Sequence, residues 1–157
     1  MFTNFLAWVS NSALADWVVA EAYTWPTLES LHFVSLCVLF GSILVIDLRL
    51  IGIVREPCAA VVQRLTRIAL AAFAVNFLTG VLFLFGNTYK YVGNWAFNIK
   101  MLLILAAGLN ALFYKLRLER IVHGTDVTRA SITVGALSFL FWSGVIICGR
   151  MITFYAP

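Results

Sequence analysis

Four long apolar runs, separated by short polar connections, dominate the hydrophobic pattern of this chain. A helix that crosses a membrane needs about 20 mostly apolar residues. The runs that satisfy this requirement cover approximately residues 27–48, 68–85, 97–114 and 131–155. Because the connections are short, consecutive helices should be antiparallel neighbours. The pattern predicts an all-α fold, an integral membrane up-down four-helix bundle, and we expect residues 1–157 to form a single membrane domain.

The first 25 residues follow a different pattern. Polar residues interrupt their apolar positions and no basic segment precedes them, so the stretch does not have the form of a standard signal peptide. Tryptophan favours the depth of the lipid headgroups. The residues spaced to line one face of a helix at the interface are Phe5, Trp8, Val9, Trp17 and Val18. The sequence therefore predicts an amphipathic interfacial helix over residues 1–25.

The composition identifies a lipid bilayer as the main solvent of the chain. Hydrophobic residues make up 62% of the sequence and charged residues only 11%, with a mean hydropathy of +0.96. Soluble domains are usually about 45–50% apolar and about 25% charged. A soluble core of this size could not bury so much apolar surface. The net charge of +4 therefore bears on membrane orientation and lipid headgroups, and we expect no nucleic-acid partner.

The basic residues predict how the bundle is oriented. Eight of the 11 Lys and Arg residues flank the first and third connections between the spans, whereas Lys90, Lys100 and Arg150 lie toward the other side. The positive-inside rule places the first and third connections in the cytoplasm. We therefore predict a multi-pass protein of a bacterial inner membrane, with both termini and the 86–96 connection on the periplasmic side.

Side chains capable of binding or proton transfer collect at the outer end of the predicted bundle. They stand in the first turns of the first and third spans and in the last turns of the fourth, which lie at the same depth in an up-down bundle. Ionisable residues inside a span tend to face the bundle interior, paired or functional. These side chains are Glu29, His32, Lys100, Met101, Cys148, Arg150 and Met151.

Each ionisable member of this set also has a purely structural explanation. Lys100 and Arg150 are near enough to the surface to snorkel into the headgroups. Glu29 has the place of an exposed first-turn acid that favours the helix dipole. His32 cannot snorkel far. One possibility is a buried structural histidine that is hydrogen-bonded to Glu29 or a serine. The other is a histidine that binds a ligand or transfers protons.

Only two histidines occur in the chain, and this limits the haem sites that the sequence could form. His123 belongs to the third connection, on the opposite side from His32. A bis-histidine haem needs both ligands at similar depth, so this arrangement lacks its second histidine. A haem b would have to rest on His32 alone, or on His32 completed by Met101, Met151 or Lys100.

The remaining polar residues of the spans suggest packing roles. Asn76 and Asn110 lie near the middle of their spans, where a buried amide needs a partner, so we expect interhelical hydrogen bonds. Glycines and serines spread through the spans should allow close helix contacts. At the cytoplasmic end, Asp47 most simply forms an interfacial ion pair with Arg49 or Arg67.

Three stretches together resemble a known group of proteins. The segments ESLHFVSLCVLFGSILVIDLRLIG, NWAFNIKMLLILAAGLNALFY and WSGVIICGRMITFY resemble an uncharacterised bacterial family of small four-helix membrane proteins, from about Trp25 onward. More remotely, the pattern is similar to copper-resistance D-type membrane domains and small membrane cytochromes b. The resemblance implies a four-helix membrane fold without an established activity. The remoter relatives suggest haem, quinone or copper.

The sequence contains no nucleophile elbow, phosphate loop or HExxH motif, so hydrolytic chemistry of the soluble type is disfavoured, and the pattern does not decide whether the chain is an enzyme. We favour an electron-transfer or quinone/haem-associated protein. His32 would be an axial ligand or quinone-bonding group that Glu29 orients. Lys100 and Arg150 would neutralise an anionic group of the bound molecule, such as a haem propionate.

Two other functions fit the same layer of side chains. The second in rank is a non-catalytic anchor or packing subunit of a larger membrane complex, or a homo-oligomer. The third is copper binding or transport, because imidazole, thioether and thiol groups suit Cu(I). The ligands for copper would be His32, Met101, Met151 and Cys148.

Overall fold

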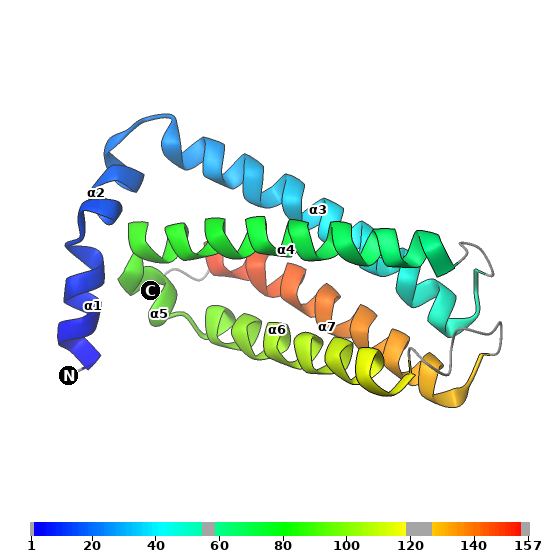
Figure 1. Cartoon of the computed structure of the whole chain (residues 1–157). Coiled ribbons are helices and arrows are strands. Elements are labelled where there is room, and N and C mark those ends of the chain that lie inside the picture. The colour runs from blue at the N-terminus through cyan, green and yellow to red at the C-terminus, as the bar shows by residue number, and fades with distance from the viewer. Residues whose placement is uncertain (1, 55–58, 119–126, 155–157) are drawn as a thin grey trace.

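All the residues that the computed structural model describes, 2–54, 59–118 and 127–154, fall into helices and their short connections (Figure 1). Four helices are long and apolar enough to cross a membrane, which confirms the four predicted spans. Each extends beyond the predicted bounds at one or both ends. The elements are α1 (Phe2–Ser10), α2 (Ala13–Ala20), α3 (Thr24–Ile51), α4 (Ala59–Gly86), α5 (Thr88–Val92), α6 (Trp95–Phe113), the π-helical turn η1 (Tyr114–Leu118) and α7 (Arg129–Phe154).

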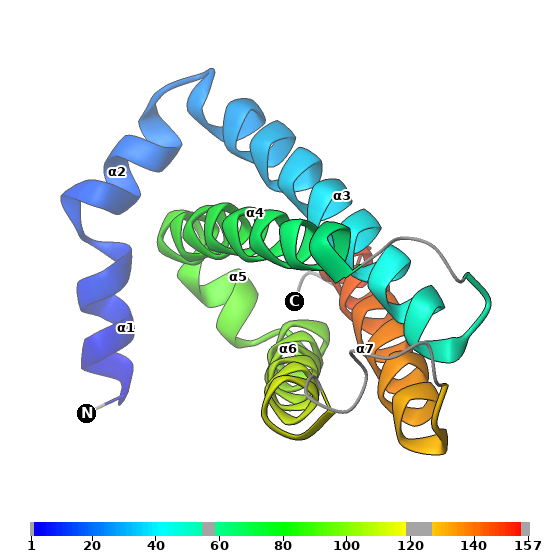
Figure 2. The ribbon, with the colours of Figure 1, turned by 45° about the vertical axis from the view of Figure 1, so that its right-hand side comes forward.

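The four long helices run side by side along one axis, as an up-down bundle requires (Figure 1). Helix α3 packs against both α4 and α7, and α6 packs against α7. Over their described lengths α4 and α6 hardly touch each other directly. Figure 2 shows α5 joining their ends at one side of the bundle. The helices therefore form a chain of contacts in the order α4, α3, α7 and α6.

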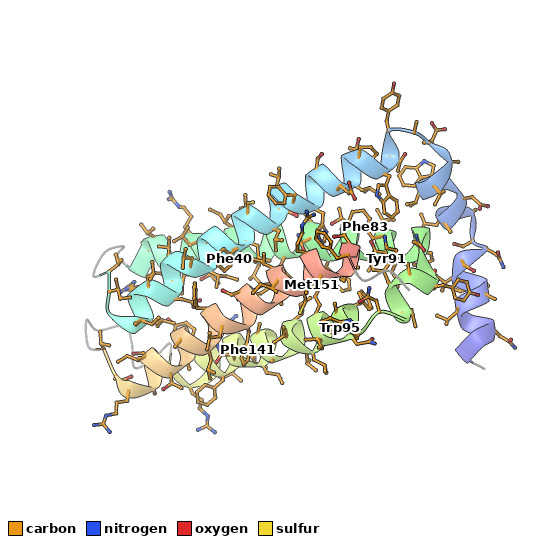
Figure 3. All side chains as sticks on the ribbon, turned by 180° about the vertical axis from the view of Figure 1, so that it is seen from behind. Phe40, Phe83, Tyr91, Trp95, Phe141 and Met151 are labelled. Carbon is orange, nitrogen blue, oxygen red and sulfur yellow. The ribbon has the colours of Figure 1, made fainter. Side chains whose placement is uncertain are left out.

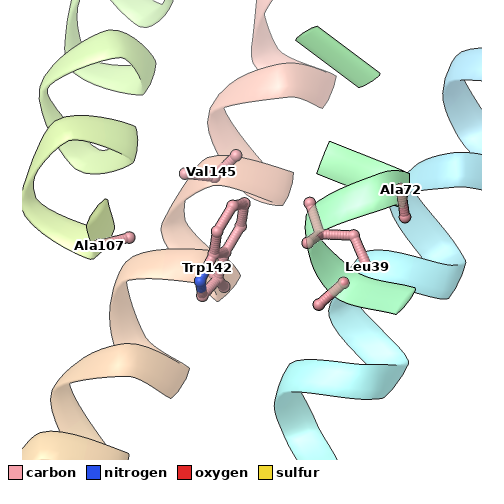
Figure 4. Packing of buried hydrophobic residues seen from close by; sticks show 6 residues of the cluster. Leu39, Ala72, Ala107, Trp142 and Val145 are labelled. Atoms are coloured by element: carbon pink, nitrogen blue, oxygen red, sulfur yellow. The ribbon is translucent and has the colours of Figure 1, made fainter. Parts of the chain in front are cut away.

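A tryptophan fills the middle of this arrangement. Trp142 of α7 is 9% exposed and lies between Ala107 of α6 and the pair Leu39 and Ala72 (Figure 4). The alanines leave room for the indole ring, and Phe73 of α4 meets it edge-on with ring centroids 6.4 Å apart. Large and small side chains thus alternate across the core, which is how close packing is reached.

Small residues and one amide join neighbouring helices, as the sequence predicts. A Cβ atom at Gly135 of α7 would lie 2.9 Å from the backbone oxygen of Asp47, so the glycine allows α3 and α7 to approach closely. The Asn110 side chain of α6 donates a hydrogen bond to the backbone oxygen of Val134 on α7, at 3.0 Å. Both contacts use the backbone of the neighbouring helix, and they fix the register of α7 against α3 and α6.

The N-terminal segment differs from the single helix predicted for residues 1–25. It forms two helices, α1 and α2, which lie across one end of the bundle (Figure 1). Ser12 separates them, because its hydroxyl accepts the backbone N–H of Ala15 and caps α2.

The predicted grouping of residues on one face of this segment is also wrong. Val9 and Val18 are buried at 4% and 0% exposure, whereas Trp8 and Trp17 are 66% and 52% exposed. Adjacent residues of a helix point about 100° apart, so each valine faces the bundle and the tryptophan before it does not. The side chain of Phe5 lies outside the described residues.

Asp47 does not form the ion pair that the sequence suggests. Its carboxyl group is buried between α3 and α7, and Arg49 and Arg67 make no ion pair with it in the described part of the chain. Arg49 lies two positions farther along α3, roughly 200° around the helix axis, and so points elsewhere. The hydrogen-bond partner of the carboxyl group is Ser138 of α7.

Candidate functional site at the His32 end of the bundle

The residues expected to form the site lie where α3 begins, α4 ends, α6 begins and α7 ends. We call this region the His32 end. Figure 3 shows Phe83, Tyr91, Trp95 and Met151 toward this end, and Phe40 and Phe141 farther along the bundle. Val18 of α2 and Trp25 of α3 pack against the end of α4, because both lie where a side chain on Gly86 would stand.

The imidazole ring of His32 is hydrogen-bonded to Thr79 of α4, and not to Glu29 or a serine as the sequence suggests. The Nδ1 atom of His32 lies 2.7 Å from the Thr79 hydroxyl oxygen. That oxygen also lies 2.9 Å from the backbone oxygen of Val75 and 3.0 Å from that of Asn76. Because the single hydroxyl proton can be donated to one of these carbonyl groups, we assign the imidazole proton to Nδ1, which then donates to Thr79. This tautomer leaves the Nε2 atom with a free lone pair.

The backbone around His32 is fixed by the amide of Asn76, which confirms the interhelical hydrogen bond expected there. Its side-chain nitrogen donates to the backbone oxygen of His32 at 2.8 Å and to the hydroxyl of Ser35 at 3.1 Å. The Ser35 hydroxyl in turn donates to the same backbone oxygen at 2.9 Å. Three polar groups from α3 and α4 therefore hold His32 in place within apolar surroundings.

Aromatic rings line the side of His32 that faces α4. Phe83 meets the imidazole edge-on with ring centroids 5.3 Å apart, and Trp25 packs on Phe83 at 5.2 Å. Gly80 faces the imidazole, since a Cβ atom there would lie in ordinary contact with His32 Cε1, at 3.7 Å. Glu29 is exposed and accepts a hydrogen bond from the Trp25 indole at 3.1 Å. Glu29 thus orients the tryptophan rather than the histidine.

Lys100 of α6 reaches the same place from the other side of the bundle. It is half-buried, and its Nζ atom lies 3.5 Å from the position that a Cβ atom of Gly149 would take. It is close enough to His32 and Cys148 to interact with both electrostatically. Within the described ranges no carboxylate pairs with it and no acceptor binds its ammonium group. The structure therefore brings together His32, Lys100 and Cys148.

Arg150 and Met101, two other predicted members of the site, point elsewhere. Arg150 is exposed, and its guanidinium group lies over the ring of Phe154 on the same helix, 4.9 Å from the centroid. Met101 is 45% exposed, because it points about 100° away from Lys100 around α6. Met151 is half-buried. No group of three or more His, Cys, Asp or Glu side chains suited to a metal occurs among the described residues.

Two residues near the candidate site, Thr79 and Tyr91, were not predicted from the sequence. Thr79 lies one helical turn after Asn76, and this spacing of polar residues in an apolar span was the available signal. Tyr91 of α5 packs edge-on against Phe97 with ring centroids 5.7 Å apart. Burial raises the pKa of the Tyr91 hydroxyl above its usual value, and the nearby charge of Glu29 raises it further. Tyr91 therefore stays a neutral hydrogen-bond donor at physiological pH.

Comparison with known proteins adds a family to this description. Residues 5–155 match the family described as a family of unknown function, DUF6644. The chain belongs to this family. The match confirms the resemblance to an uncharacterised family, and it does not extend to copper-resistance D-type domains or cytochromes b, for which the similarity stays a prediction from the sequence. No curated protein and no solved structure matches the chain.

Proposed function

We propose that this DUF6644 protein binds the headgroup of a membrane quinone or quinol at the His32 end, between His32 Nε2 and Lys100 Nζ. From the positive-inside rule we expect this end to lie in the outer leaflet of a bacterial inner membrane. A bound quinone would associate the protein with electron transfer in that membrane. The two polar groups come from α3 and α6, which are the first and third of the four long helices.

The observation that carries this proposal is the half-buried ammonium group of Lys100, which has no anionic partner in the described part of the chain. A cation inside a span is costly and points to a functional partner. A quinone carbonyl oxygen accepts hydrogen bonds, and so suits the Lys100 ammonium. A quinol hydroxyl donates one, and so suits the free lone pair on His32 Nε2. The quinol therefore suits both groups, since its hydroxyls donate and accept, whereas the quinone suits the Lys100 ammonium alone.

The aromatic surroundings agree with the same class of ligand. Small-molecule sites are mostly apolar and aromatic, with a few polar groups that fix the orientation of the ligand. Phe83 stands against the His32 ring, and Trp25 packs behind it. A flat, lipid-soluble ring with two oxygen atoms fits such a site better than a hydrated ion.

Haem b and copper have less support from the same geometry. The long helices carry a single histidine, and Arg150 points away from His32, so it would not neutralise a haem propionate. Met101 is exposed, which removes one of the expected copper ligands from the cluster. A role as a packing subunit of a larger complex stays a prediction from the sequence.

Replacing Lys100 by methionine tests the proposal. A hydrogen bond to a charged group contributes about 1.5–3 kcal/mol, so Lys100→Met should weaken quinone binding roughly tenfold or more. The measurement is a titration of the protein in lipid nanodiscs with a short-tailed ubiquinone or menaquinone, followed by quenching of tryptophan fluorescence. An absorption spectrum of the same sample tests haem, which would give a Soret band.

Arg150→Gln provides the matched control, because it also removes one positive charge from this end of the bundle. The Arg150 guanidinium lies over Phe154 and not against His32, so this variant should bind quinone as the wild type does. An equal loss of affinity in both variants would show a general effect of charge. Absence of saturable quinone binding by the wild type would contradict the proposal outright.

A further inference from the structure

Asp47 is a buried carboxyl group at the opposite end of the bundle from His32. Its side chain is 3% exposed and lies between α3 and α7. On α7, Gly135 lies against the backbone oxygen of Asp47, and Ser138, almost one turn farther along, is hydrogen-bonded to the carboxyl group. The second carboxyl oxygen, Oδ2, is buried and has no hydrogen-bond partner. The quinone site proposed above makes no use of this group.

No described positive charge compensates Asp47. Charged and titratable side chains stand at this end on its own helix and on each element near it, but none of them forms an ion pair with the carboxyl group in the described ranges. Tyr114, which packs against Leu50 and Val134, has its own interaction. The residues concerned are Arg49 on α3, Arg64 and Arg67 on α4, Tyr114, Lys115 and Arg117 on η1, and Arg129 on α7.

The free energy of burial determines whether the Asp47 carboxyl group is a charged carboxylate or a neutral acid in the folded protein. A buried carboxylate without a counter-ion is very unfavourable, and an oxygen atom left without a donor adds to the cost. The neutral acid avoids the charge. Its proton can lie on the oxygen that faces Ser138 and be donated to the serine hydroxyl, so that Oδ2 becomes a carbonyl oxygen. An unpaired carbonyl oxygen costs less than an unpaired carboxylate oxygen.

We propose that Asp47 is a proton-binding site, at which the protein holds a proton as a carboxylic acid between α3 and α7, bonded to Ser138. A metal cation fits the place less well. One carboxyl group and one hydroxyl group supply too few oxygen ligands for Ca²⁺ or Mg²⁺, which take six or more. The described residues contain no cluster of acidic, histidine or cysteine side chains that would complete such a site.

Infrared spectroscopy tests this proposal on the full chain in lipid nanodiscs. The chain has three aspartates, Asp16, Asp47 and Asp126, so ¹³C-labelled aspartate marks few carboxyl groups. At neutral pH the wild type should show the C=O band of one labelled carboxylic acid. The band should persist in Asp16→Asn and in Asp126→Asn, disappear in Asp47→Asn, and give way to carboxylate bands as the pH is raised.

Two results would overturn the proposal. The first is a wild-type spectrum at neutral pH in which all labelled aspartates give carboxylate bands. The second is loss of the acid band at constant pH when NaCl replaces choline chloride, because it would identify a cation site. The spectrum of the wild type decides the first point even if Asp47→Asn does not fold, since Asp16→Asn and Asp126→Asn assign the band by elimination.

Discussion

Trp142→Ala should lower the free energy of unfolding by about 3–5 kcal/mol, the usual cost of removing a large buried aromatic side chain. Trp142 joins all four long helices, because its neighbours in the core lie on α3, α4 and α6 (Figure 4). Helices α4 and α6 hardly touch each other directly over their described lengths, so the indole ring fills the space between them. The measurement is unfolding by SDS in mixed micelles, followed by circular dichroism.

Trp17→Ala is the control for this result. Trp17 is 52% exposed on α2, and its truncation should change the free energy of unfolding by about 0.5 kcal/mol or less. The comparison holds the residue type constant and changes only the burial. Equal losses in the two variants would mean that Trp142 does not fill the centre of the bundle.

Gly135→Ala should be the next most damaging change, with a loss of about 1–3 kcal/mol. The added methyl group would lie 2.9 Å from the backbone oxygen of Asp47 and 3.1 Å from atoms of Leu50 and Ile51. A backbone atom cannot rotate away as a side chain can, so α3 and α7 would have to move apart. The same unfolding measurement applies.

Gly41→Ala, on α3, separates this effect from the general effect of glycine in a helix. A Cβ atom at Gly41 would meet nothing within 4 Å. Alanine is the better helix former by about 0.5–1 kcal/mol, so this variant should be as stable as the wild type or slightly more stable. If Gly135→Ala were equally harmless, the close contact between α3 and α7 would be wrong.

The sequence predicts the four long helices and their antiparallel order well, because these follow from length, hydropathy and the short connections. The four spans, the up-down order and the amides of Asn76 and Asn110 agree with the structure. The position of Lys100 beside His32 along the bundle also follows from counting residues along antiparallel helices, and the charge of Lys100 is near enough to act on the imidazole.

The direction of a side chain around its helix is harder to predict, because it depends on which neighbours pack. Arg150 has the right depth for the site, but Gly149 is the residue that faces Lys100. Glu29 stands one turn before His32, and yet the histidine turns to Thr79 across the interface with α4. Asp47 is likewise two positions from Arg49 and pairs instead with Ser138. The position of a residue along the bundle follows from its own helix, whereas its hydrogen-bond partner depends on how two helices pack together.

The proposed quinone site and the proposed proton site lie on the same helix but are separated by apolar packing. His32 and Asp47 stand near opposite ends of α3, with Leu39 between them at 2% exposure. Leu39 belongs to the cluster around Trp142 and Val145. The two sites can therefore be altered independently, and a failure of one proposal leaves the other intact.

The proposed quinone site requires that His32 keep its proton on Nδ1, toward Thr79, and offer Nε2 to a ligand. Nitrogen-15 NMR of histidine-labelled protein in nanodiscs tests this most directly, because the chain has only two histidines and His32→Gln assigns their signals. We predict a protonated Nδ1 and an unprotonated Nε2 at His32 without ligand, and a shift of that Nε2 signal alone when quinol is added. A proton on Nε2 without ligand, or an Nε2 signal unchanged at saturating quinol, would contradict the account.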